Sequence, residues 1–229
     1  MGELGRKFAA AFLTEGRWML YFKGLGVTLG IAVLAAILGV ILGTVLGIMK
    51  LSFRENGKKT VWNHIATAYV DVIRGTPSVL QLLIMWFIVF ATWNNGVAVA
   101  SISFGLNSAA YVSEIVRGGI LAVDVGQMEA GRSLGLSKAM TMRYIILPQA
   151  LKNMVPPLGN EFITLLKETA IVGYVSLTDL TRAANQIASR TYEAFMPLIG
   201  TAVIYFVVIK ILTILLGVLE RRLRESDNR

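Results

Sequence analysis

Three acidic residues stand in otherwise apolar stretches of this sequence, and they are the groups best suited to chemistry. They are Asp71, Glu114 and Glu161. A carboxylate in such surroundings is suited to holding a positive charge, because an isolated buried charge is costly unless a partner or water compensates it. The sequence has no cysteine and a single histidine, His64, which excludes thiolate chemistry and clusters of Cys or His metal ligands. These residues favour reversible binding over covalent catalysis.

The composition around these acids is that of a membrane protein. Of the 229 residues, 55% are hydrophobic and 16% are charged, against about 25% charged in soluble domains, and the mean hydropathy is +0.64. A soluble globule and a disordered chain are thereby excluded. The net charge of +8 is interpreted as topology signals and contacts with membrane lipid, because the basic residues are spread around apolar segments. No nucleic acid partner is expected.

The positions of the charged residues divide the chain into candidate membrane spans. Two long stretches lack charge, 24–49 with 26 residues and 75–113 with 39, and about 20 apolar residues make one span. The second stretch is expected to form two helices around a turn at 93–96. A span near 194–219 and a more polar one at 157–178 complete the set. We predict an all-α integral membrane helical bundle with five transmembrane helices.

The spans define three parts of the chain and an orientation. The parts are an amphipathic lead-in at 1–23, a single transmembrane domain at 24–219 and a tail at 220–229. Lys and Arg residues number thirteen in the connections that follow the first, third and fifth spans, and six in the other connections. The positive-inside rule therefore predicts that the N-terminus lies outside and the C-terminus in the cytoplasm.

The first span carries small residues at intervals of four, namely Ala35, Gly39, Gly43 and Gly47. Such a stripe allows another helix to approach closely. We interpret it as packing within the chain, and a homodimer seam is the alternative.

The predicted cytoplasmic segment before the fourth span has the pattern of two short helices joined at a glycine. Gly135 can end the first helix in the left-handed conformation, and the Ser137 hydroxyl can cap the second. Pro148 is expected to limit the second helix. An apolar ridge on this helix would consist of Ala139, Met142 and Ile146, flanked by Lys138 and Arg143. The ridge suits a groove in a cytoplasmic partner, and a helix lying on lipid headgroups is the alternative.

The same segment carries a spaced motif. Glu129-Ala130-Gly131 is followed after three residues by Gly135, and after nine more by Ile145-Ile146-Leu147-Pro148. This motif closely resembles the EAA signature of ABC-importer permeases, which reads E-A-A, three residues, G, nine residues, I-x-L-P. The departure is Gly131, which stands where the signature has alanine and affects the fine packing there.

Three further motifs resemble the polar amino acid permease subfamily, the histidine, glutamine and arginine type. They are Arg74-Gly75-Thr76-Pro77 with Gln81, Asn107-Ser108 with Glu114-Ile115, and Gly159-Asn160-Glu161-Phe162 with Leu166-Lys167-Glu168-Thr169. Together with the EAA signature they cover about 69–181, roughly half of the chain, in the family's order.

The resemblance implies the type I ABC importer permease fold and the plasma (inner) membrane of a prokaryote. A coupling region at about 126–150 would contact ATP-binding cassette ATPase subunits through Glu129, Ala130, Gly131, Gly135, Lys138, Met142, Arg143, Ile145, Leu147 and Pro148. A second permease copy or a similar paralogue, and an extracytoplasmic amino acid binding protein, are further implied partners. The sequence lacks the glycine-lysine-Ser/Thr run of a phosphate loop. ATP and magnesium are therefore expected on the partner ATPase, with no cofactor bound and no reaction catalysed by this chain.

A polar amino acid is the implied small-molecule substrate. Pro77 is expected to kink its helix and free backbone acceptors. The predicted substrate-binding residues are Glu161, Asn160, Arg74, Thr76, Ser78, Gln81, Asn107, Ser108 and Glu114. Glu161 is the preferred partner of the substrate's positive charge, and Arg74 with Thr76 or Ser78 that of its carboxylate. If Glu161 meets the substrate's side chain, the substrate is cationic, such as arginine, lysine or histidine.

Alternatives stay open for these residues and for the function. Asp71 and Arg74 are spaced i, i+3 and are expected to pair with each other. Glu161 could form a salt bridge with Lys167 or Arg74 instead of meeting substrate. A small ion-gradient-driven secondary transporter of amino acids is the alternative function, which the lack of an internal inverted repeat disfavours. A membrane-embedded enzyme is disfavoured because catalytic groups are not gathered in one place.

Overall fold

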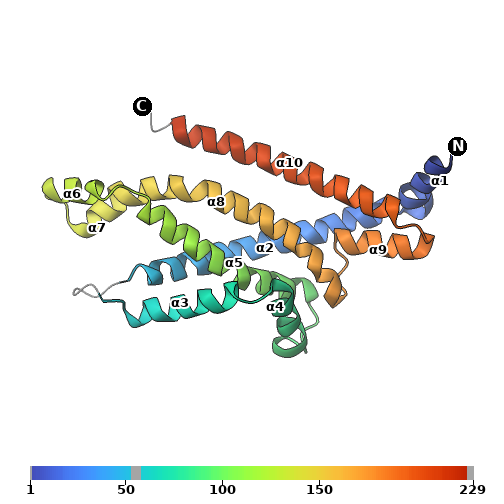
Figure 1. Ribbon diagram of the computed structural model, residues 1–229, viewed down its shortest axis with the longest axis horizontal. Coiled ribbons are helices and arrows are strands. Elements are labelled where there is room, and N and C mark those ends of the chain that lie inside the picture. The colour runs from blue at the N-terminus through green and yellow to red at the C-terminus, as the bar shows by residue number, and fades with distance from the viewer. Residues whose placement is uncertain (1, 53–57, 226–229) are drawn as a thin grey trace. The chain divides into compact units, whose positions relative to one another are not determined.

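The computed structural model describes residues 2–52 and 58–225, and within these ranges its regular elements are helices (Figure 1). The α-helices are α1 (Glu3–Phe8), α2 (Trp18–Lys50), α3 (Val61–Arg74), α4 (Ser78–Ile84), α5 (Gly96–Leu121), α6 (Gly126–Ser133), α7 (Lys138–Thr141), α8 (Leu147–Glu168), α9 (Leu180–Thr191) and α10 (Phe195–Glu225). Three segments have π-helical geometry: η1 (Ala9–Leu13), η3 (Met85–Val89) and η4 (Met142–Ile146). Two have 3-10 geometry: η2 (Thr14–Gly16) and η5 (Thr169–Val175). The predicted all-α class is confirmed.

Among the described residues, three helices are long and apolar enough to cross a membrane. They are α2, α5 and α10. The helix α3 and the segment formed by α4 and η3 are long and apolar enough only when they are counted together as one interrupted span. The more polar α8 does not meet it. Length and composition thus support three or four spans, and the count of five stays a prediction.

The helix expected within 75–93 is interrupted more strongly than a kink would require. Pro77 lacks an N–H and disfavours helical geometry at the preceding residue, so α3 ends at Arg74 and α4 begins at Ser78. The 7 residues of α4 and the 5 of η3 extend about 18 Å at 1.5 Å per residue. This length is less than the roughly 30 Å of a bilayer core. The turn expected at 93–96 is present, where the Asn95 side chain accepts a hydrogen bond from Ala98 N at 3.1 Å.

Other helix ends differ from the predicted spans. The first long helix, α2, begins at Trp18 rather than at residue 24, and α10 continues to Glu225. In place of a span at 157–178, α8 begins at Leu147, contains Pro156 and Pro157, and ends at Glu168, where the backbone tightens into η5. Apolarity marks the membrane-buried part of a helix, whereas backbone hydrogen bonding continues into polar flanks, so charge-free stretches underestimate helix length.

The chain forms two compact units, and the long helices contribute to both. The first unit comprises Met1–Ala36, Ser78–Gly105 and Ile163–Ile214, and the second comprises Ile37–Pro77, Leu106–Phe162 and Leu215–Arg229. Each unit has its own buried apolar side chains. In the first unit these include Ile31, Leu82, Phe104, Leu165 and Val172, with a further cluster around Tyr21, Leu180 and Ile187. In the second they include Val112, Val116, Ile146, Ala150 and Met154.

The small-residue stripe of α2 packs within the chain at its two last positions. A Cβ atom on Gly43 would lie 2.5 Å from Val112 Cβ, and one on Gly47 would lie 2.9 Å from Val116 Cβ. Both valines belong to α5. The glycines therefore allow α2 and α5 to approach closely in the second unit, as the intrachain interpretation predicts.

Candidate functional site

Glu161 on α8 receives a hydrogen bond from α5 in the second unit. Ser108 Oγ donates to Glu161 Oε1 over 2.7 Å. Ser108 and the adjacent Asn107 are buried, and Glu161 is partly buried. One neutral donor uses a small part of the acceptor capacity of a carboxylate, whose two oxygens offer about four sites. Glu161 can therefore also accept hydrogen bonds from an ammonium or guanidinium group.

Arg74 stacks on an aromatic ring instead of pairing with an acid. Its Cζ atom lies 5.3 Å from the ring centroid of Tyr111, which belongs to α5. Within the part of the chain that the structure describes, no ion pair joins Arg74 to Asp71 or to Glu161. The expected pairing of Asp71 with Arg74 is thus not formed, because Arg74, in the last turn of α3, finds the cation–π contact with Tyr111.

Thr76 satisfies the end of α3 with its own side chain. Its hydroxyl donates to Val72 O over 2.9 Å and reaches Ile73 O at 3.5 Å. The carbonyl oxygens of Val72 and Ile73 therefore have a partner within the chain rather than being held open for a solute. Ser78 and Gln81 lie on α4, in the first unit.

Glu114 is shared between two cations in the second unit. Lys50 Nζ, at the end of α2, donates to Glu114 Oε1. Arg117 donates to Glu114 Oε2 from Nε at 3.0 Å and from Nη2 at 2.8 Å. Both carboxylate oxygens are thus engaged, and the triad links α2 to α5. Glu161, with a single neutral donor, is the better candidate for a substrate's positive charge.

The coupling region has the turn that its sequence predicts. Gly135 takes a φ of +82°, and Leu136 N donates to Gly131 O at 3.1 Å, which closes the end of α6. Ser137 then caps α7, with its Oγ accepting from Met140 N at 3.2 Å. A positive φ costs glycine little, and the serine satisfies a free N–H, so each residue has the local role expected.

Pro148 does not end the second helix, contrary to the sequence prediction. The segment runs from α7 through η4 directly into α8, and Pro148 is the second residue of α8. Proline lacks the N–H that would bond to Tyr144 O and crowds that carbonyl. The π-helical geometry of η4, at Met142–Ile146, widens the backbone immediately before the proline, and the helix continues.

Two of the three residues of the predicted apolar ridge face inward, and the third, Ala139, is exposed. Ile146 is 6% exposed and belongs to the core of the second unit, and Met142 packs against that core. Of the ten predicted coupling residues, Glu129, Ala130, Gly135, Lys138, Arg143, Leu147 and Pro148 are exposed. Four large apolar side chains are exposed here, and of these Leu147 alone is among the ten residues named as predicted coupling contacts, without belonging to the ridge. They are Leu134, which is 80% exposed, with Met140, Tyr144 and Leu147, and we call these four residues the coupling face.

Gly131, the departure from the signature, is in tight contact with α7. A Cβ atom at this position would lie 2.5 Å from Thr141 Cγ2 and 2.8 Å from Thr141 Oγ1. Gly131 and Thr141 are both buried. Glycine here and threonine at 141 are therefore matched in size, which explains how the packing accommodates the departure.

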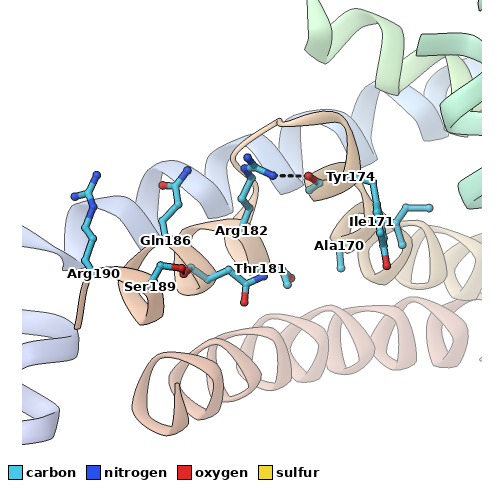
Figure 2. Close-up of a pocket in the computed structure, with 10 residues that line it drawn as sticks. Ala170, Ile171, Tyr174, Thr181, Arg182, Gln186, Ser189 and Arg190 are labelled. Carbon is cyan, nitrogen blue, oxygen red and sulfur yellow. Dashed lines mark hydrogen bonds between the residues drawn. The ribbon is translucent and has the colours of Figure 1, made fainter. Parts of the chain in front are cut away.

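A cavity of about 850 Å³ lies in the first unit between η5 and α9 (Figure 2). The helix α9 buries Leu180, Ala183, Ala184 and Ile187 and turns polar side chains toward the cavity. Figure 2 shows Arg182, Gln186 and Arg190 spaced along α9, with Arg182 hydrogen-bonded to Gly173 O on η5.

Asp179 begins α9 and fixes its first turn. Its carboxylate accepts from Thr181 N at 3.0 Å and from Arg182 N at 2.8 Å. Burial raises the pKa of the Asp179 carboxyl above its usual range, although the backbone N–H groups of Arg182 and Thr181 act in the opposite direction.

The cavity residues were not predicted as a site from the sequence. Arg182 and Arg190 entered that prediction only as topology signals, although the spacing 182, 186, 190 is a signal by itself. Residues at i, i+4 and i+8 share a helix face, and on this short helix the opposite face is apolar. What the sequence could not supply is η5, whose 3-10 turn forms the other wall.

Comparison with known proteins gives a consistent match. The family model of the binding-protein-dependent transport system inner membrane component matches residues 35–225. The arginine transport system permease protein ArtQ of Bacillus subtilis (strain 168) is 45% identical over 172 residues, which cover 73% of this chain and 77% of that protein. The glutamine transport system permease protein GlnP of Escherichia coli (strain K12) is 37% identical over 166 residues, covering 71% of this chain and 76% of that protein.

Solved structures show the same fold. A chain from the crystal structure of an amino acid ABC transporter with histidines matches with a TM-score of 0.81 and 45% identity, covering 89% of this chain and 94% of that one. A chain from an inward-facing MetNI methionine ABC transporter matches with a TM-score of 0.80 at 20% identity, covering 92% and 99%. The second likeness concerns the fold alone.

Proposed function

This chain belongs to the family of binding-protein-dependent transport system inner membrane components, and on that premise we propose that it carries a polar, cationic amino acid across the membrane by alternating access. It is a multi-pass membrane protein with the type I ABC importer permease fold, and a permease subunit of an amino acid ABC importer. The ion-gradient-driven alternative is not favoured by these relatives.

The observation that carries the proposed substrate class is the hydrogen bond from Ser108 to Glu161. This hydrogen bond orients the partly buried Glu161 carboxylate on α8, which is more polar than the other long helices. It leaves further acceptor sites on the carboxylate for a cation. An arginine transport permease and a solved amino acid transporter with histidines are among the similar proteins and support this class, whereas the glutamine transport permease does not distinguish it. We propose that Glu161 accepts the positive charge, with Asn107, Ser108, Asn160 and Arg74 as further contacts in the second unit.

The family indicates which kinds of partner this permease has, and the exposed residues of this chain suggest where the ATPase binds. Permeases of this family work with separate ATPase subunits and a binding protein. We propose that the coupling face, Leu134, Met140, Tyr144 and Leu147, seats on the ATPase, which supplies ATP and magnesium. A second permease copy or a paralogue would complete the pathway. The N-terminus would lie outside and the C-terminus in the cytoplasm, as the distribution of basic residues predicts.

The test reconstitutes the permease with its ATPase and its binding protein in lipid vesicles. ATP hydrolysis is measured while arginine, lysine, histidine and glutamine are titrated. We expect the cationic amino acids to stimulate hydrolysis most, and Glu161→Gln to remove that preference, while Glu3→Gln on the exposed α1 leaves it unchanged. The substrate proposal fails if glutamine stimulates most and Glu161→Gln keeps that order. Uptake by this chain alone, driven by an ion gradient, would overturn the importer assignment.

A further inference from the structure

The cavity between η5 and α9 is an electropositive, hydrogen-bonding pocket with no acid among its described lining residues. Arg182, Asn185, Gln186, Ser189 and Arg190 line it from α9, and Tyr174 lines it from η5. Two guanidinium groups therefore face about 850 Å³ of space without a lining carboxylate to neutralise them. Ligand pockets typically enclose about 300–1,000 Å³ and place a few convergent polar groups in this way.

The positive charge of these two arginines is not compensated by an ion pair within the described residues. Arg182 donates from Nη1 to the neutral Gly173 carbonyl, and its buried Nε has no hydrogen-bond partner. Arg190 is exposed, and the salt bridges in residues 2–52 and 58–225 involve neither arginine. Guanidinium groups favour carboxylates, which they can bind through two parallel hydrogen bonds.

The pocket is held in place by contacts beneath α9. Leu180 N donates to Thr28 Oγ1 of α2 at 3.2 Å. A Cβ atom on Gly24 would lie 2.6 Å from Asp179 O, so α2 and the start of α9 are in direct contact. Gln186 Nε2 donates to Thr178 Oγ1 at 3.2 Å, which orients its amide. Polar groups that are fixed before binding lose little entropy when a ligand arrives.

We propose that this pocket is a carboxylate-binding site, and that it takes a free amino acid through its α-carboxylate. Arg182 and Gln186 lie one helical turn apart and would hold the carboxylate, while Arg190, about 12 Å from Arg182 along the helix axis, raises the local concentration of anionic groups. The identity of the ligand as an amino acid rests on the proposed function, whereas its carboxylate is argued from the pocket alone.

A carboxylate could also be presented by an acidic side chain of a protein partner. The concave shape favours a small molecule, because the cavity volume falls within the range that encloses one. The two sources differ in what must be added to see binding. A free amino acid needs only the permease complex, whereas a protein carboxylate needs the binding protein.

The experiment measures binding of radiolabelled arginine and glutamine to the permease–ATPase complex in nanodiscs, without ATP and without the binding protein. Competitors are argininamide and glutaminamide, which keep each side chain and lack the carboxylate. We expect the amides to bind about tenfold or more weakly than the parent amino acids, as for loss of a charge-assisted pair. Arg182→Lys keeps the positive charge but loses the two parallel N–H donors of the guanidinium group, and Arg190→Gln loses the charge. Each variant should raise the Kd of both amino acids about tenfold. Each should also reduce the ratio between the Kd of an amide and the Kd of its parent amino acid.

Arg6→Gln on the exposed part of α1 removes the same charge elsewhere in the first unit and should leave both Kd values unchanged. The proposal of a carboxylate-binding pocket would be overturned if amides and amino acids bound equally well, or if both arginine variants left the Kd values unchanged. Variants that keep amino acid binding but weaken docking of the binding protein would overturn it in favour of a protein carboxylate. If the pocket proposal fails but ATP-driven uptake is observed, the proposed function still stands. If the unaltered complex shows no ATP-driven uptake of amino acids, the proposed function itself is contradicted.

Discussion

Ser108 Oγ lies 2.7 Å from Glu161 Oε1 and joins α5 to α8 through a hydrogen bond between two side chains. The two residues are 53 positions apart in the sequence, and the same contact orients the acid proposed to hold the substrate's charge. Since a serine hydroxyl is neutral, it directs the carboxylate without cancelling its charge.

Removal of this donor should destabilise the protein and should do so through Glu161. Ser108→Ala is expected to lower the free energy of unfolding by about 1.5–3 kcal/mol, the range for a hydrogen bond to a charged group. In a Glu161→Gln background the same substitution should cost less, because its charged partner is gone. Thermal unfolding of the four proteins of this cycle measures the coupling. Equal costs in both backgrounds would show that the contact carries no energy.

The Lys50–Glu114–Arg117 triad should matter more for stability than for substrate choice. Glu114→Gln leaves two cations without their acid, and the Lys50 side chain is only 12% exposed. We expect a loss of about 2 kcal/mol in the free energy of unfolding, with an unchanged order of preference among amino acids. Glu3→Gln, which breaks the exposed pair with Lys7, is the matched control and should change neither. An altered preference in Glu114→Gln would place this acid in the substrate path.

Gly131 and Thr141 should behave as a size-matched pair. Gly131→Ala introduces a methyl group 2.5 Å from Thr141 Cγ2, and such overpacking costs typically about 1–3 kcal/mol. Adding Thr141→Ser removes the methyl group and keeps Oγ1, which would lie 2.8 Å from the new Cβ atom, so it should restore part of the stability and of the substrate-stimulated ATP hydrolysis. Thermal unfolding and hydrolysis are measured on the single and double variants. Additive losses in the double variant would contradict the pairing.

The coupling face should be sensitive to charge where it is most exposed. Leu134 is 80% exposed, so Leu134→Asp leaves no buried cavity and should spare folding. We expect at least a tenfold weaker association with the ATPase, because a charge in an apolar contact loses its hydration. Pull-down of the ATPase and crosslinking from position 134 measure this. Leu4→Asp, at another exposed leucine on α1, should have no effect, and an equal loss there would point to general misfolding.

Asp179 should make stability depend on pH in a defined direction. Its pKa is raised by burial, so the fold favours the protonated form. The stability that this group contributes is full below the usual aspartate value of about 3.9 and is lost as the pH rises through the raised value. Asp179→Asn keeps the cap and cannot titrate. The Tm difference, unaltered protein minus Asp179→Asn, should grow as the pH falls from 7 to 4, and a constant difference would contradict this.

The sequence predicts the local structure better than the direction in which side chains face. Gly135 and Ser137 have the conformations expected of them, since turn and cap chemistry depends on neighbouring backbone atoms. Ile146 was expected at the surface and is buried, because an isolated helix pattern does not say which side meets the rest of the chain.

The candidate site shows the same limit. Glu161 stands out as an acid in a candidate membrane span, but its partner Ser108 is on another helix and no local rule pairs them. Arg74 contacts Tyr111 rather than Asp71, although the i, i+3 spacing is favourable, since a tertiary contact outweighs a weak pair on one helix. The arginine pocket depends on η5, whose 3-10 geometry has no clear sequence signal.

The passage of α7 through η4 into α8 joins the proposed coupling helix and the helix that carries Glu161 into one continuous helical segment. From Lys138 to Glu161 the backbone remains helical, a length of about 35 Å at 1.5 Å per residue. Within this stretch the π-helical segment η4 precedes Pro148, and Pro156 and Pro157 lie inside α8. A movement of α7 would therefore reach Glu161 along this helical segment, and the widened turn before Pro148 and the two later prolines are the places where the segment can bend.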